Sequence, residues 1–175
     1  MAPSAGGGSA SLVPAIDLNA DVGESFGPWP MGEDERLIPL VSSVNVACGA
    51  HAGDPATIER TVRLALASGA AVGAHPGYPD LAGFGRRDLA MDPADLEASI
   101  VYQVSAVAGF TRALGGELHH VKPHGALYNA AARDSALAEI VARAIRRCSD
   151  AFLVYGPPGS ALLDAASAAG LGAVP

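Results

Sequence analysis

Apolar residues recur along this chain with two alternating periods. Short segments with alternating or continuous apolar residues predict strands, and segments with apolar residues three or four apart predict helices. The expected strands lie within 15–24, 44–48, 70–74, 117–121 and 152–155, and a sixth begins after residue 170. The expected helices are 33–40, 54–69, 92–114, 134–147 and 159–169. This uninterrupted alternation predicts an α/β fold with a parallel sheet and right-handed crossovers.

Two of these helices have boundaries marked by residues with strong end preferences. Asp54 is a good N-cap, Pro55 suits the first helical position, and Gly69 suits the helix end. Asp92 and Pro93 repeat the same opening at the longest helix. These signals locate the connecting loops and therefore show which polar residues follow each strand.

Polar side chains lie at or just beyond the ends of successive expected strands. In parallel sheets, ligands bind at the carboxyl ends of the strands, where such side chains meet. Four separate strand ends carry an acid, a histidine or a lysine, which chance does not readily explain. We therefore expect one shared site formed by Asp17, Asn19, Asp21, His51, His75, Lys122 and His124.

Lys122 is the only lysine of the chain, and the other ten basic side chains are arginines. Pro123 ends the strand directly after it, because proline donates no ladder hydrogen bond and restricts the preceding residue. A lysine is a compact, titratable point charge that arginine cannot replace. One surface lysine left by an arginine-rich composition is the alternative, but the neighbouring histidines favour a functional role.

The acids and histidines of this expected site fit two kinds of chemistry. Asp17, His51 and His75 are ligand types that hold Zn²⁺ or Mn²⁺ and leave a position for water. Without a metal, Asp17 or His51 could act as general base and Asn19 could orient a substrate. Lys122 and His124 would then stabilise developing negative charge. No tight ligand spacing separates these two possibilities.

Arg86 follows a glycine-rich loop that includes Gly83 and Gly85. An arginine on such a loop can hold a substrate carboxylate or phosphate in a bidentate contact. A solvated surface arginine is an equally good interpretation of the same pattern.

Composition limits the classes of protein that this chain can represent. Half of its 175 residues are hydrophobic, which suffices for one domain with a packed core. No run of about 18 apolar residues predicts a membrane span, and a formal net charge of −7 argues against a nucleic-acid partner. The two cysteines form no disulfide framework or zinc motif, which fits a reducing cytoplasm. Residues 1–14 are Gly/Ser-rich and predict a disordered tail, which leaves 15–175 as one domain.

The number of expected strands has a consequence for the architecture. A closed β/α barrel needs about eight strands, whereas this sequence ends where the sixth expected strand begins. The sheet is therefore open, or the chain is the first part of a longer barrel that lacks its C-terminal strands here.

Four long segments, in the same order, resemble the LamB/YcsF family: IDLNADVGESFG, MGEDERLIPLVSSVNVACGAHAGDP, GAHPGYPDLAGFGRRD and LHHVKPHGALYN. The resemblance runs from about Ile16 to the last residue. It implies a seven-stranded β/α barrel of the glycoside hydrolase/deacetylase type. It also implies an ATP-dependent 5-oxoprolinase, which converts 5-oxo-L-proline to L-glutamate with ATP as co-substrate and works together with subunits B and C.

The implied reaction suits the expected site residues. Phosphorylation of the lactam oxygen would make the carbon electrophilic, and Asp17 or His51 would then activate water. Lys122 and His124 would meet the developing negative charge. The substrate contacts would come from Asn19, Asp21, His75, Arg86 and Asn129. The alternatives are a metal-dependent N-deacetylase of small or sugar substrates and a non-catalytic lactam-binding subunit.

Overall fold

The computed structural model describes residues 16–175 and contains one six-stranded parallel sheet. The expected tail at 1–14 lies outside the described residues. The strands pair in chain order, β1 with β2 and so on to β6. Their bounds are β1 (Asn19–Val22), β2 (Ser43–Ala47), β3 (Ala71–His75), β4 (His120–Val121), β5 (Leu153–Tyr155) and β6 (Gly172–Val174). The predicted α/β class with a parallel sheet is confirmed.

Helices connect the strands, and most begin where their capping residues predicted. Their bounds are α1 (Asp34–Leu37), the 3-10 turn η1 (Ile38–Leu40), α2 (Pro55–Ser68), α3 (Pro93–Ala113), α4 (Gly125–Ala131), α5 (Ser135–Cys148) and α6 (Ala161–Ala168). Asp54 caps α2 by accepting hydrogen bonds from the backbone of Ala56 and Thr57. Gly69 ends α2 in the left-handed conformation, with φ of 75°.

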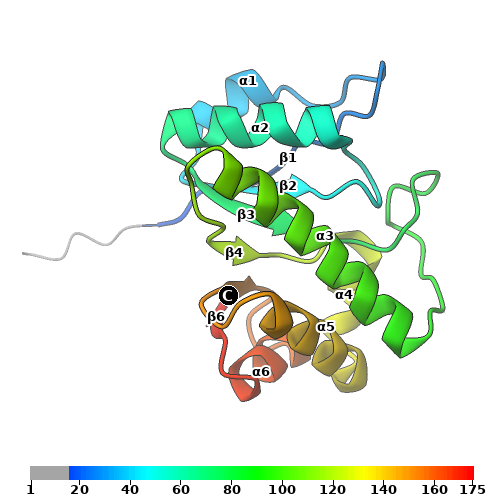
Figure 1. Ribbon diagram of the computed structural model, residues 1–175. Coiled ribbons are helices and arrows are strands. Elements are labelled where there is room, and N and C mark those ends of the chain that lie inside the picture. Colours follow the sequence, from blue (N-terminus) through cyan, green and yellow to red (C-terminus); the bar gives the residue numbers. More distant parts are fainter. Residues whose placement is uncertain (1–15) are drawn as a thin grey trace, which may run out of the picture.

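The helices cover one face of the sheet and leave the other face to polar side chains. Right-handed crossovers between strands that pair in chain order place the long connecting helices on the same side. Figure 1 shows α2, α3, α5 and α6 following one another around the strands. The strand residues toward these helices are apolar and buried: Val22, Val44, Val46, Val72, Val121 and Val154. The alternate residues face the other side: Asn19, Asp21, Ser43, Asn45, Gly73, His75, His120 and Tyr155.

Three sequence-based expectations about these elements were wrong in detail. The first strand begins at Asn19, so Ile16 and Leu18 precede it and are 83% and 55% exposed. The fourth strand has two residues instead of five. A helix, α4, directly follows His124 where a loop was expected. Short elements are held by tertiary packing rather than by local sequence, and α4 buries Leu127 and Ala131 in the core.

Barrel closure stays a prediction, because β1 and β6 are not hydrogen-bonded to each other within residues 16–175. In that same part of the chain, no helix combines the length and apolar content needed to cross a membrane.

Candidate functional site

A row of hydrogen-bonded polar groups crosses the inner face of the sheet. Asn45 of β2 donates to Asn19 of β1 at 2.5 Å and to the Asp21 carboxylate at 2.7 Å. The Asn45 side-chain oxygen lies 2.7 Å from Nε2 of His120 in β4. His120 also stacks on Tyr155 of β5, with ring centroids 4.2 Å apart. This row holds the inner side chains of four strands in register.

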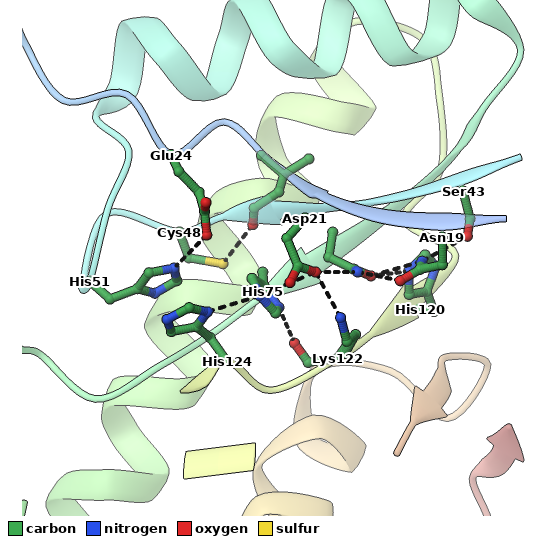
Figure 2. Close-up of polar contacts among 12 residues, drawn as sticks. Asn19, Asp21, Glu24, Ser43, Cys48, His51, His75, His120, Lys122 and His124 are labelled. Atoms are coloured by element: carbon green, nitrogen blue, oxygen red, sulfur yellow. Dashed lines mark hydrogen bonds and ion pairs between the residues drawn. The ribbon is translucent and has the colours of Figure 1, made fainter. Parts of the chain in front are cut away.

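The Asp21 carboxylate links this row to Lys122 (Figure 2). The Lys122 ammonium donates to Oδ1 of Asp21 at 2.7 Å, and Nε2 of His75 lies 3.4 Å from the same oxygen. Burial alone would raise the pKa of Asp21, but hydrogen bonds and charge interactions with His75 and Lys122 lower it well below its usual range. Asp21 therefore remains ionised and fixes the position of the lysine charge.

His75 is the last residue of β3, and the backbone holds its ring. Nδ1 lies 2.6 Å from the carbonyl oxygen of Lys122, which can only accept a hydrogen. Nδ1 therefore carries the hydrogen, and Nε2 points toward Asp21 and toward Nδ1 of His124, 3.0 Å away. The His75 side chain is buried, with 1% exposed.

His124 is held in a similar way from the loop before α4. Its Nε2 lies 2.8 Å from the carbonyl oxygen of Phe84. Phe84 has φ of 55°, and it is the only non-glycine residue with positive φ among residues 16–175. Such a backbone conformation is unfavourable and persists only where the surroundings impose it. Burial lowers the pKa of His124 to about 4, with a further contribution from His75.

His51 lies behind His124 and is enclosed completely. The two rings stack with centroids 3.7 Å apart and planes within 3° of parallel. Neither ring nitrogen of His51 has a hydrogen-bond partner, and Nε2 lies 3.9 Å from Oε1 of Glu24. Burial, followed by the neighbouring histidines, lowers the pKa of His51 to about 2. Burial also raises the pKa of Glu24.

A cavity of about 570 Å³ opens in front of Lys122 and His124. Its size suits a small polar molecule. Six of the nine expected site residues line it: Asp21, His75, Arg86, Lys122, His124 and Asn129. The guanidinium of Arg86 lies 5.2 Å from the ring centroid of Phe84, a distance typical of a cation–π contact.

The other three expected residues do not line this cavity. Asn19 belongs to the hydrogen-bonded row, and His51 is buried behind His124. Asp17 lies outside the cluster, which corrects the expected geometry. Its carboxylate accepts hydrogen bonds from Ser43, at the amino end of β2, and from Tyr155. Asp17 precedes β1, so it meets the opposite end of β2 from the end that carries His51.

Some residues of the site were not found by sequence reasoning. The cavity is also lined by Asp88, Tyr128 and Arg133, and Glu24 joins the histidines. Glu24 comes three residues after Asp21 in the same segment, so its place after a strand end was a usable signal. Tyr128 was not identified from the sequence, because the helix that carries it, α4, was not expected.

The donor atoms of the buried cluster could hold a divalent cation. One ligand atom each from Glu24, His51, His75 and His124 all lie within 4.8 Å of one another. Of the expected metal ligands, His51 and His75 belong to this cluster and Asp17 does not. The other two members of the cluster are Glu24 and His124. Imidazole nitrogens with one carboxylate oxygen are a donor set typical of Zn²⁺.

Fold and site together define a parallel β/α protein with a polar cavity at the carboxyl ends of its strands. The chain belongs to the LamB/YcsF family, whose model matches residues 16–175. Over 156 residues it is 57% identical to the A subunit of 5-oxoprolinase from Methylococcus capsulatus, covering 89% of this chain and 60% of that protein. The protein of the same name from Geobacillus kaustophilus is 54% identical, with 89% and 60% covered.

A solved structure agrees with this family membership. The lactam utilization protein from Thermus thermophilus superposes with a TM-score of 0.89 at 49% identity. The match covers 91% of this chain and 64% of that chain. This chain thus spans less than two thirds of the length of these relatives.

Proposed function

We propose that this chain acts in an ATP-dependent 5-oxoprolinase, opening the lactam of 5-oxo-L-proline to give L-glutamate. The observation that carries the proposal is the cavity in which Lys122, paired with Asp21, lies beside His124. Relatives at 54–57% identity that carry the name of the 5-oxoprolinase A subunit support the choice of substrate. That name supports an assembly with further subunits, which we propose to be B and C. The two cysteines of the described chain are free, which supports a cytoplasmic location.

The substrate has an amide oxygen and a carboxylate, and the cavity offers a cation for each. Lys122 lies where it would stabilise negative charge on the lactam oxygen, whereas His124, with a pKa of about 4 and its Nε2 hydrogen donated to Phe84, would line the site as a neutral ring. Arg86 would bind the carboxylate, and Asn129 would donate to or accept from the ring amide. Asp21 would hold Lys122 in place rather than accept a proton, because its pKa is so low.

The general base is not assigned to Asp17 or His51, the two residues first expected to fill this role. Neither Asp17 nor His51 lines the cavity, whereas His75 and His124 do. In the proposed sequence, the terminal phosphoryl group of ATP passes to the lactam oxygen and ADP leaves. One water then adds to the ring carbon and the carbon–nitrogen bond breaks, which gives glutamyl phosphate. A second water releases phosphate, so two waters are consumed for each L-glutamate and ADP.

The test is an assay of glutamate release from 5-oxoproline, using the protein assembled with its partner subunits. We expect release only when ATP is present, with one ADP formed for each glutamate. Glutamate release without ATP, or ATP hydrolysis that does not depend on 5-oxoproline in the assembled enzyme, would contradict the proposal.

A metal-dependent N-deacetylase is the second candidate, favoured by the Glu24 and histidine cluster. It predicts acetate release from N-acetylated sugars without ATP, and the same preparation can be assayed for it. If the assembly binds 5-oxoproline but turns over neither substrate, the chain would be a lactam-binding subunit.

A further inference from the structure

The strongest unexplained feature of the molecule is the polarity of the buried cluster behind the cavity. Glu24, His51, His75 and His124 come from three separate loops and the end of β3, and their side chains point toward one another (Figure 2). All three histidines are buried, with 4% or less of each residue exposed. A core position of this kind normally carries apolar side chains, so the cluster needs a physical reason.

Backbone carbonyls determine which ring nitrogens of this cluster carry hydrogens. The carbonyl oxygens of Lys122 and Phe84 accept from Nδ1 of His75 and from Nε2 of His124. In the neutral rings, the two remaining nitrogens are acceptors, and they face each other 3.0 Å apart. Two facing lone pairs repel each other, so a positive charge next to them would stabilise this arrangement.

A proton on Nε2 of His75 would satisfy that pair and would also face the Asp21 carboxylate, 3.4 Å away, but it would leave His51 unexplained. Both ring nitrogens of His51 lack a hydrogen-bond partner, and 0% of its side chain is exposed. Buried polar groups without partners are costly and rare in native proteins. Glu24 does not solve the problem, because its oxygen is 3.9 Å from Nε2 of His51, too far for a hydrogen bond.

We propose that Glu24, His51, His75 and His124 together bind one divalent transition-metal ion of the Zn²⁺ class. Three imidazole nitrogens and one carboxylate oxygen match the preferences of such an ion. The donor atoms lie within 4.8 Å of one another, whereas tetrahedral Zn²⁺ sites need about 3.3 Å, so small side-chain rotations suffice. The carbonyl partners of His75 and His124 are the supporting contacts that metal-bound histidines usually make.

Glycines next to the cluster let the backbone pack closely against two of its rings. A Cβ on Gly77 would lie 2.9 Å from Nδ1 of His51, and a Cβ on Gly85 would lie 2.8 Å from Cδ2 of His124. Backbone therefore packs directly against both rings and leaves no room for a side chain at either glycine. The two rings are stacked on each other, and Nε2 of His51 is the nitrogen directed toward Glu24.

This inference goes beyond the proposed function, because it concerns what the cluster binds whether or not the lactam is the substrate. The test measures metal binding directly. The protein, assembled with its partners, is stripped with a chelator and titrated with Zn²⁺ or with Co²⁺, whose visible absorption reports a four-coordinate site. We expect one equivalent per chain, together with a rise in the melting temperature.

Four variants test whether the ion binds at the cluster or at exposed side chains elsewhere. Glu24→Gln keeps the shape of the side chain and should weaken binding at least about ten-fold, while His51→Leu should weaken it at least about a hundred-fold. His119→Ala and Glu35→Gln change an exposed histidine and an exposed acid outside the cluster and should leave binding unchanged. Because His51→Leu removes two unpartnered nitrogens, its metal-free form should fold at least as stably as the metal-free parent.

Two results would overturn the proposal. The first is no binding of Zn²⁺ or Co²⁺ by the stripped protein above that of the weakened variants, which would leave a shared proton between His75 and His124 as the explanation. The second is binding that Glu24→Gln and His51→Leu alter no more than the controls do. If His51→Leu does not fold, the Glu24→Gln titration alone decides between these outcomes.

Discussion

Gly73 of β3 lies directly opposite His120 of β4, and a Cβ on residue 73 would overlap the His120 imidazole. This relationship explains why a fully buried histidine fits on the inner face of the sheet. His120 occupies the space that a side chain at position 73 would fill. From there it contacts Asn45 and stacks on Tyr155.

We predict that Gly73→Ala lowers the free energy of unfolding by roughly 1 to 3 kcal/mol, because the added methyl group forces the imidazole or the strand to shift. Chemical denaturation measures the change. Gly109→Ala in α3 is the matched control, because a Cβ there meets no atom within 4 Å and should stabilise the helix by about 0.5 to 1 kcal/mol. Equal effects of the two substitutions would contradict this account of the packing.

Arg86 and Arg87 are adjacent but should differ in their effects. Arg86 lines the cavity, whereas Arg87 pairs with Asp80, whose side chain is 2% exposed. Arg86→Ala should raise the KM for 5-oxoproline about ten-fold without changing the melting temperature. Arg87→Ala should lower the stability of the protein, because it leaves a buried carboxylate without its cation.

Steady-state kinetics and thermal unfolding of both variants test this contrast. Arg36→Ala, which removes a guanidinium 83% exposed, is the control for loss of surface charge. A normal KM in Arg86→Ala would instead support the alternative interpretation, in which Arg86 is a solvated surface arginine that does not contact the substrate.

Local signals explain which parts of the fold could be predicted from sequence. The alternation of Val44 and Val46 with polar residues, and the capping residues Asp54 and Gly69, act within a few positions of themselves. Such signals predicted the alternation of strands and helices and the bounds of α2 correctly. The helix α4 carries no comparable signal, since it starts at a glycine and is only seven residues long.

The composition of the site was harder to predict, because it depends on distances along and between strands. Periodicity placed Asp17, Asn19 and Asp21 on one face, but it did not show that Asp17 precedes the strand. Glu24 lies on irregular backbone, where no period relates it to His51. The register between strands and the loop paths, which tertiary packing sets, decided both cases.

The cap of α2 gives a pH-dependent contribution to stability. Hydrogen bonds from the backbone of Gly27 and then of Thr57 lower the pKa of Asp54 from 3.8 to about 2. The folded pKa is below the unfolded value, so this contribution is present above about pH 4. It is lost as the pH falls through 2.

We predict that Asp54→Ala costs about 1 kcal/mol of unfolding free energy at pH 7. The difference from the parent should shrink between pH 4 and pH 2, measured by urea denaturation at each pH. Glu35→Gln in α1, an exposed acid, should show no such trend. A difference that grows toward low pH would contradict the assignment of the cap.

Lys122 should not tolerate replacement by arginine. Its ammonium donates to Asp21 at 2.7 Å and its side chain is only 24% exposed. A planar, larger guanidinium cannot occupy the same place and face the cavity in the same way. We predict that Lys122→Arg lowers kcat in the assembled enzyme about a hundred-fold. Circular dichroism should show a normal fold, and a near-normal kcat would remove Lys122 from the proposed catalytic residues.

Substitutions of Asp17 and Asp21 should have different effects on kcat. Asp17 bonds to Ser43 and Tyr155 away from the cavity, whereas Asp21 lines the cavity and holds the Lys122 ammonium. Asp17→Asn should therefore leave kcat within about two-fold of the parent and lower stability by about 1 kcal/mol or less. Asp21→Asn removes the charge that fixes Lys122 and should lower kcat about a hundred-fold. Measured with saturating ATP, a large loss in Asp17→Asn with little change in Asp21→Asn would restore Asp17 as the catalytic acid–base residue and reject the site assigned here.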